Sequence, residues 1–265
     1  MKARDDPADI GLLEEGLDAL GLLETVGNGI LHNNATELLW TYIKEIELFN
    51  EAYGLVKVCS RKELIVKHIL DSLAPLERMH DTYFRLFPTP HSPLPTPQTV
   101  PGTAIADVGS GAGLPGIPLA ICLPEAEFTL IERMGRRAGF LRNCVAVLGL
   151  PNVRVEELEL EKAVPGRFDL AVFRAFRPLT PEILKGLTAI LKPGGVLAAW
   201  KGRLENARQE ITAVENYVAS VEIIPLTVPF LGEERCLTVI SAKPRQGSQE
   251  TEAGAEGSEG RPFLL

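Results

Sequence analysis

The sequence predicts an α/β fold in which a helical extension precedes a mostly parallel, seven-stranded sheet. Apolar residues recur at helical spacing through the first 86 residues, and six prolines follow within residues 87–101. From residue 102 onwards, short apolar runs alternate with helical patterns, which is typical of a parallel sheet covered by helices on both faces. We therefore expect a helical extension (1–86), a proline-rich connector (87–101), a sheet domain (102–244) and a disordered tail rich in Gly, Ser and Glu (245–265).

The extension is expected to contain three helices. Residues 8–24 and 35–52 each place apolar side chains on one helical face, and glycines and asparagines separate the two segments. Ser60 and Glu63 have the spacing of a capping box, which predicts that a third helix begins there and continues through Leu73.

The sheet domain contains seven apolar runs that are expected to form strands. The last two runs are joined by a short segment without a helical pattern, so they pair most simply as an antiparallel hairpin at the edge of the sheet. The expected strands are 103–108, 127–132, 153–156, 168–173, 195–200, 220–227 and 236–242, and the expected helices are 117–123, 135–148, 180–191 and 204–217.

The net charge of −8 is unevenly distributed along the chain. Residues 1–30 carry −5 and residues 245–265 carry −2, so the part between them is almost neutral. Because the distribution of charge matters more than its total when a protein binds a polyanion, local basic clusters permit RNA binding without indicating it. The clusters are Arg133, Arg136, Arg137 and Arg142; Arg174 and Arg177; and Lys201 and Arg203.

The sequence indicates neither a membrane span nor a metal site. No apolar run approaches the roughly 18 residues that suggest a transmembrane helix. The charged, acidic N-terminus does not resemble a signal peptide, so we expect a cytoplasmic protein. The four cysteines form no CxxC pair and the four histidines have no ligand spacing, so we expect reduced thiols and no metal.

Residues 103–118, TAIADVGSGAGLPGIP, predict a buried strand, a tight glycine loop and the start of a helix. Such a loop lets the backbone approach a ligand closely, and the first amides of a helix attract anionic or polar groups. Two motifs overlap in it. From Gly111 the loop matches the dinucleotide pattern GxGxxG, whereas from Asp107 it reads DxGxGxG, which is similar to the loop of S-adenosylmethionine enzymes.

Asp107 favours the S-adenosylmethionine interpretation. A carboxylate suits the cationic methionine end of that cofactor, whereas it would repel a pyrophosphate. Glu132 ends the second strand and can accept hydrogen bonds from ribose hydroxyls in either cofactor class, so it does not discriminate. The expected terminal hairpin resembles a methyltransferase more than a dehydrogenase. The alternatives are an NAD(P)-dependent oxidoreductase and a non-catalytic nucleotide or S-adenosylmethionine sensor.

Further motifs lie along the chain: HILDSL at 68–73, DVGSGAGLPGIPLA at 107–120, FTLIERMGRRAGFLRN at 128–143, FRAF at 173–176, WKG at 200–202 and VPFLGEER at 228–235. Together they resemble the RsmG family, also called GidB, of bacterial 16S ribosomal RNA guanine-N7 methyltransferases, over roughly residues 8–243. The chain departs from the family pattern in two places. Gly54-Leu55-Val56 stands where the family has Asn-Leu-Thr, and the connector is longer.

The resemblance implies a Rossmann-like class I methyltransferase that uses S-adenosylmethionine to methylate guanine N7 in 16S ribosomal RNA, free or within the small ribosomal subunit. We expect a monomer. Because guanine N7 carries a lone pair and no proton, alignment is expected to matter more than a general base. Arg174 and Lys201 are the candidate catalytic groups, as hydrogen-bond donors to guanine O6. The expected cofactor-binding residues are Asp107, Gly109, Ser110, Gly111, Ala112, Gly113, Leu114, Glu132, Leu160, Glu161 and Arg174.

His68, Asp71 and Ser72 lie within one turn of the third expected helix. Their types invite comparison with a catalytic triad, but a helical serine lacks the sharp strand-to-helix turn that exposes such a nucleophile. We therefore expect these three residues to brace the helical extension against the sheet.

Overall fold

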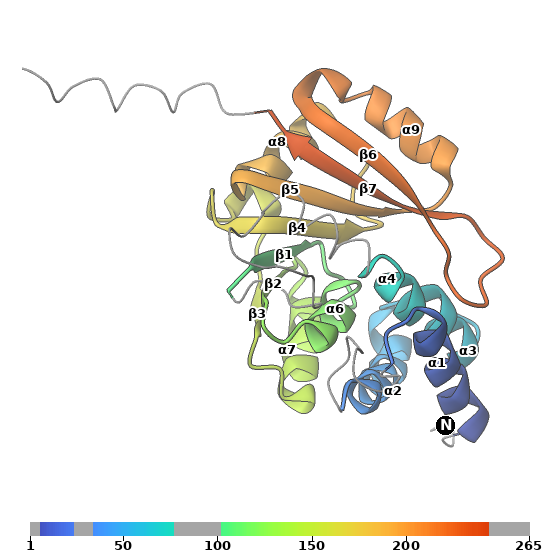
Figure 1. Ribbon diagram of the computed structural model, residues 1–265. Helices are drawn as coiled ribbons and strands as arrows, with labels where there is room; N and C mark the ends of the chain where they lie inside the picture. Colours follow the sequence, from blue (N-terminus) through green and yellow to red (C-terminus); the bar gives the residue numbers. More distant parts are fainter. Residues whose placement is uncertain (1–5, 24–33, 77–101, 244–265) are drawn as a thin grey trace, which may run out of the picture.

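The computed structural model describes residues 6–23, 34–76 and 102–243, and a single seven-stranded sheet dominates it (Figure 1). The strand order is β3-β2-β1-β4-β5-β7-β6. Strands β1 to β5 run parallel, and β7 is antiparallel to both of its neighbours. The strands are β1 (Ala104–Val108), β2 (Glu127–Ile131), β3 (Val153–Glu156), β4 (Phe168–Arg174), β5 (Leu191–Lys201), β6 (Val218–Leu226) and β7 (Arg235–Ala242).

This topology confirms the expected parallel sheet with a terminal antiparallel hairpin. The hairpin joins the sheet through its second strand, because β7 pairs with β5 on one side and with β6 on the other. Strand β5 starts at Leu191, four residues before the predicted start, since the turn at 192–195 continues into the strand through a register shift against β4.

The helices lie close to their predicted positions. The predicted helix at 8–24 ends earlier, at Ala19, because Gly21 turns the chain with a φ of +68°. The predicted helix at 204–217 is divided into α9 and a short 3-10 turn. The elements are α1 (Pro7–Ala19), α2 (Ala35–Tyr53), α3 (Arg61–Leu64), the π-helical η1 (Ile65–Leu70), α4 (Asp71–Leu73), α6 (Gly116–Cys122), α7 (Gly135–Leu148), η2 (Leu160–Lys162), α8 (Pro181–Ala189), α9 (Leu204–Thr212) and η3 (Glu215–Tyr217).

Ser60 caps the third helix of the extension, as its sequence predicts, and the reciprocal bond of the capping box is displaced by one residue to Cys59. The Ser60 hydroxyl accepts a hydrogen bond from the Glu63 amide at 3.2 Å, and the Glu63 carboxylate accepts one from the Cys59 amide at 2.7 Å. Elements α3, η1 and α4 then follow without a break. Within the described parts of the chain, no helix is long and apolar enough to cross a membrane.

Two hydrophobic cores cover the two faces of the sheet. The first contains Ile105, Leu130 and Leu237 from the sheet, together with α1, α2, α6 and α7. The second contains Val108 and Phe173, and α8 closes it (Figure 1). The extension therefore shares a continuous core with the sheet. Residues 87–101 and 245–265 lie outside the described residues, so the predicted connector and tail stay predictions.

Candidate active site

The predicted glycine loop joins β1 to α6 at the carboxyl edge of the parallel strands. Its backbone is held from two sides, since the Gly109 amide donates to the Ile131 carbonyl at 2.8 Å and the Gly113 amide donates to the Ser110 carbonyl at 2.7 Å. Gly109 has a φ of +70°, and a Cβ there would stand 2.4 Å from the Phe176 ring. Glycine is thus required at this position both by the backbone and by the close approach of Phe176.

Asp107 lies beneath the loop with its side chain fully buried. Its Oδ2 accepts a hydrogen bond from the Gly116 amide at 3.0 Å, and a Cβ on Gly116 would lie 2.5 Å from that oxygen. Within the described residues, Oδ1 is buried without a partner. Burial raises the pKa of Asp107 to about 7, against the opposing effect of the Gly116 amide. The first amide of α6 therefore serves Asp107, although the sequence suggested that a ligand would use it.

Glu132 links the loop to the end of β2. Its Oε2 accepts from the Gly111 amide at 3.0 Å and its Oε1 accepts from the Met134 amide at 2.8 Å, with only 4% of the residue exposed. Each carboxylate oxygen has a second lone pair, so the group retains the capacity to accept from two hydroxyls. Its orientation is fixed before any ligand arrives.

The helical extension supports the same loop. The Tyr42 hydroxyl, on α2, donates to the Ala112 carbonyl at 2.6 Å within the buried core. Ser110, Ala112 and Leu114 are themselves buried, and the Ser110 hydroxyl donates to the Asp107 carbonyl at 2.8 Å. These three predicted cofactor residues therefore pack into the protein interior and support the conformation of the loop.

Leu160 and Glu161 lie in η2, on the opposite side of the sheet from α7. Leu160 is buried in the second core, whereas Glu161 is exposed and forms an ion pair with Arg177 at 2.8 Å. That ion pair connects η2 with the segment after β4, which also contains Phe176. The structure thus brings Glu161 to the same segment that lies against Gly109.

Arg174 ends β4 and points into a network with the extension. Its Nη1 donates to Asp71 Oδ2 at 2.9 Å and to the Lys67 carbonyl at 3.3 Å, and its Nη2 lies 2.8 Å from His68 Nδ1. Arg235, at the start of β7, donates to the other oxygen of Asp71 at 3.0 Å. His68 and Asp71 therefore brace the extension against the sheet, as predicted.

Two further hydrogen bonds involve the residues around this brace. The Trp200 indole donates to the Asp71 carbonyl at 3.1 Å. The Ser72 hydroxyl donates to the His68 carbonyl at 2.6 Å and so stays within its own helix. Of the three residues that the sequence grouped, Ser72 alone makes no contact of this kind with the sheet among the described residues.

A cleft of about 620 Å³ opens beside this network. Lysines and arginines dominate its charged lining, and Lys201 forms an ion pair with Glu210 while its ammonium lies 5.8 Å from the centre of the Phe173 ring. Phe176 lines the cleft and also contacts Gly109, so the cleft adjoins the glycine loop. Its charged lining residues are Lys57, Lys67, Arg174, Arg177, Lys201 and Arg235, with the acids Glu63, Asp71 and Glu210.

Sequence reasoning missed Tyr42, Phe176 and Arg235 as parts of this site. The FRAF and VPFLGEER motifs contained the last two, but no local spacing indicates that Arg235 reaches Asp71 across 164 positions. Tyr42 had the pattern of an ordinary core residue, and only its contact with the loop distinguishes it.

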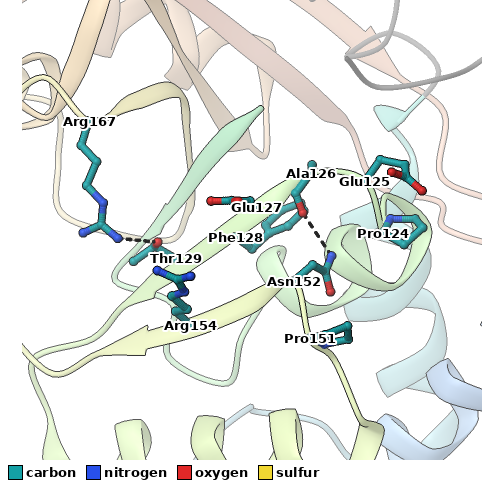
Figure 2. A pocket seen from close by; sticks show the side chains of 10 residues that line it. All are labelled: Pro124, Glu125, Ala126, Glu127, Phe128, Thr129, Pro151, Asn152, Arg154 and Arg167. Carbon is teal, nitrogen blue, oxygen red and sulfur yellow. Dashed lines mark hydrogen bonds between the residues drawn. The ribbon is translucent and has the colours of Figure 1, made fainter. Parts of the chain in front are cut away.

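A second pocket, of about 290 Å³, lies at the opposite edge of the sheet (Figure 2). It is formed where β2 and β3 begin, and its polar side chains serve the fold. The Asn152 amide donates to the carbonyls of Ala120, Leu123 and Ala126, and Arg167 donates to the Thr129 hydroxyl at 3.2 Å. We assign no ligand to this pocket, because these groups already hold the end of α6 and the strands together.

The strand order, the antiparallel β7 and the glycine loop after β1 define a class I methyltransferase fold. Residues 94–238 match the family model GidB, rRNA small subunit methyltransferase G, and the chain belongs to this family.

Curated relatives agree over most of their length. Ribosomal RNA small subunit methyltransferase G of Treponema denticola is 37% identical over 242 residues, which cover 87% of this chain and 93% of that protein. The protein of the same name from Nitrosococcus oceani is 33% identical over 236 residues, which cover 89% of this chain and 95% of that protein. Among solved structures, the tRNA (m1A58) methyltransferase TrmI of Aquifex aeolicus aligns with a TM-score of 0.49 at 14% identity, over 64% of this chain and 70% of that one.

Proposed function

We propose that this protein transfers a methyl group from S-adenosylmethionine to N7 of a guanine in 16S ribosomal RNA. The observation that supports it most is membership of the rRNA small subunit methyltransferase G family, with relatives covered to more than 90% of their length. The site agrees with this, since a cleft rich in cations adjoins the glycine loop. The same proposal places the protein in the cytoplasm, where ribosomal RNA is found.

The residues present fit S-adenosylmethionine. Glu132 offers two prealigned acceptor oxygens for ribose hydroxyls, and a Cβ on Gly111 would meet only the Gly109 carbonyl oxygen, at 3.8 Å. Leu160 and Glu161 are proposed to lie beside the adenine. Asp107 is fully buried and accepts from the Gly116 amide, so we assign it support of the loop. When bound, the cofactor supplies an electrophilic methyl group on a sulfonium.

The protein's main task in this reaction is to position the base. Guanine N7 attacks through a lone pair that carries no proton, so the rate depends on alignment with the methyl group and on exclusion of water. Arg174 and Lys201 remain the proposed groups near the purine, although both are engaged in ion pairs within the described structure. The target base must lie in a loop or be extruded from its stack to enter the cleft.

The alternatives fit the structure less well. A dinucleotide-dependent oxidoreductase would place a pyrophosphate above the buried Asp107, and neither the antiparallel β7 nor the family supports that chemistry. A non-catalytic sensor would share the cofactor site with a methyltransferase, so only a product measurement separates the two.

Incubation of 16S ribosomal RNA or small subunits with isotope-labelled S-adenosylmethionine, followed by nucleoside mass spectrometry, tests the proposal. We expect labelled 7-methylguanosine with the wild-type protein. Glu132→Ala should abolish it by weakening cofactor binding, whereas Glu127→Ala, an exposed position at the start of β2, should leave it unchanged. Absence of label would refute the enzymatic function, and label on another base or atom would refute the assignment to guanine N7.

A further inference from the structure

His68 lines the cleft, yet the reaction outlined above assigns it no role. It lies in η1 and its side chain is half-buried beside Arg174. Asp71, at the start of α4, holds that arginine in place and is itself paired with Arg235. The position of the imidazole is therefore defined by a network that spans η1, α4, β4 and β7.

The contact with Arg174 fixes the tautomer of His68. A guanidinium has only hydrogen-bond donors, so the Nδ1 atom 2.8 Å from Arg174 Nη2 must be an unprotonated acceptor. The remaining proton of a neutral imidazole then resides on Nε2. Burial and the positive charge of Arg174 lower the pKa of His68 to about 4, which agrees with a neutral ring at physiological pH.

The Nε2–H group is available to a ligand. Within the described residues it donates no hydrogen bond, and it is not one of the side-chain atoms that are both buried and unpaired there. Since His68 lines the cleft, the group has access to the cleft. Phe176 connects the same cleft to Gly109, so a base held there lies next to the glycine loop.

We propose that His68 Nε2–H donates a hydrogen bond to O6 of the target guanine and thereby selects guanine over adenine. The proposal rests on the function proposed above. Guanine presents two acceptors, N7 and O6, on this edge, whereas adenine presents an amino donor at the position of O6. A donor that cannot become an acceptor would face that amino group unpaired, at a cost that disfavours adenine.

A neutral donor also suits the charge that develops on the base. The purine becomes cationic when N7 is methylated, so a guanidinium or ammonium at O6 would oppose the reaction by like-charge repulsion. A neutral imidazole contacts O6 without adding a net charge, so we assign the O6 contact to His68 in place of Arg174 and Lys201. Arg174, whose side chain is only 15% exposed, then acts as a positioning residue for His68.

The test combines enzyme variants with a substrate that lacks O6. The guanine that the labelling experiment identifies is replaced by 2-aminopurine, which keeps N7 and the 2-amino group. His68→Leu removes the donor, and His68→Gln keeps both a donor and an acceptor for Arg174. We measure kcat/KM for methyl transfer by the three proteins on both substrates, and the affinity for S-adenosylmethionine by calorimetry.

Replacing guanine by 2-aminopurine changes the intrinsic reactivity of N7 in the same way for every variant. The decisive quantity is therefore how the ratio of kcat/KM on the two substrates differs between variants. We expect loss of O6 to reduce kcat/KM about 10- to 100-fold more in wild type than in His68→Leu. His68→Gln should recover most of the sensitivity, and cofactor affinity should stay the same in all three. If His68→Leu fails to fold, His68→Phe provides the donor-free ring.

The proposal would be overturned if loss of O6 reduced kcat/KM equally in wild type and in the donor-free variant. It would also be overturned if that variant lost cofactor affinity to the same extent as activity. Either result leaves the proposed function intact, provided that the wild-type protein methylates guanine N7. Failure of the wild type to label guanine would instead refute the proposed function itself.

Discussion

At the scale of single residues, the central feature is a carboxylate enclosed between a strand and a helix. Asp107 and Gly116 lie so close that only a hydrogen at the glycine Cα fits between them. The enclosed carboxylate has one paired and one unpaired oxygen among the described residues. An ionised group in this position is costly, so its protonation state couples the loop to pH.

Asp107→Asn should change how stability depends on pH. The pKa is raised from 3.8 to about 7 on folding, so the folded state holds a proton that the unfolded state has lost. The stabilisation by this proton is complete below pH 4 and is lost as the pH rises towards 7. Asparagine, which does not titrate, keeps an acceptor for the Gly116 amide.

Chemical unfolding of both proteins at pH 5 and pH 8 measures this effect. The stability of Asp107→Asn relative to wild type should improve by about 3 kcal/mol between these values, at roughly 1.4 kcal/mol per unit over the interval from 5 to 7. Titration of His68 is common to both proteins and cancels in the comparison. A difference that is the same at both pH values would contradict a raised pKa.

At the scale of elements, the π-helical η1 brings the extension to the reactive edge of the sheet. Its residues present the Lys67 carbonyl and the His68 ring to Arg174, and Asp71 follows directly to receive two guanidinium groups. Because wider helical turns free backbone groups for other partners, they occur often at functional sites. Through these contacts with Arg174, η1 forms part of the site.

Asp71→Ala should be far more damaging than removal of a nearby exposed acid. The Asp71 side chain is 5% exposed and its loss leaves two guanidinium groups without their carboxylate, so we expect destabilisation of about 3–5 kcal/mol. Glu233→Ala, at 53% exposure, loses ion pairs with Lys67 and Arg235 and should cost at most about 1 kcal/mol. Urea unfolding measures both, and comparable losses would show that Asp71 is not a buried anchor.

Periodicity and turn chemistry predicted the elements and the terminal hairpin, but not the side-chain contacts between distant elements. The helix at 135–148 has its predicted bounds, because an apolar stripe and the left-handed Gly149 define both ends locally. The observed start of β5 differs from the predicted one because it depends on a register shift against β4, which is a property of pairing between strands and not of local sequence. The pairing of Asp71 with Arg174 and Arg235 joins residues 103 and 164 positions apart, which no local pattern encodes.

The glycine loop was predictable because its conformation needs specific residue types, whereas the roles of its neighbours were not. Positive φ angles at Gly109, Gly111 and Gly113 agree with the motif. The sequence assigned Asp107 to the methionine end of the cofactor, but it could not show that the side chain is enclosed by Gly116. That enclosure is a property of three-dimensional packing.

At the scale of the whole molecule, an acidic protein presents a locally basic cleft. Six cations and three acids form its charged lining, and five of the six cations have ion pairs with neighbouring carboxylates. Few charges are therefore available to neutralise phosphates, so RNA affinity should fall only modestly with salt.

Lys57→Ala tests which face binds RNA. Lys57 is exposed in the cleft, and no ion pair is found for it within the described part of the chain. Its replacement should reduce the magnitude of the slope of log affinity against log salt by about one, whereas Lys185→Ala, on α8 outside the cleft, should not change it. Filter binding or fluorescence anisotropy over a salt series provides the slope, and an effect of Lys185 alone would place the RNA on another face.

Among the described residues, the last strand in the sequence does not lie at the edge of the sheet. Strand β7 lies between β5 and β6. Its first residue, Arg235, donates a hydrogen bond to Asp71 in α4. During vectorial synthesis the helices leave the ribosome first, yet they find their final partner only when residues 235–242 have emerged. The helical extension therefore cannot make its contact with Arg235 until residues 235–242 have been synthesised, and a chain that lacks β7 would lack this support for the cleft.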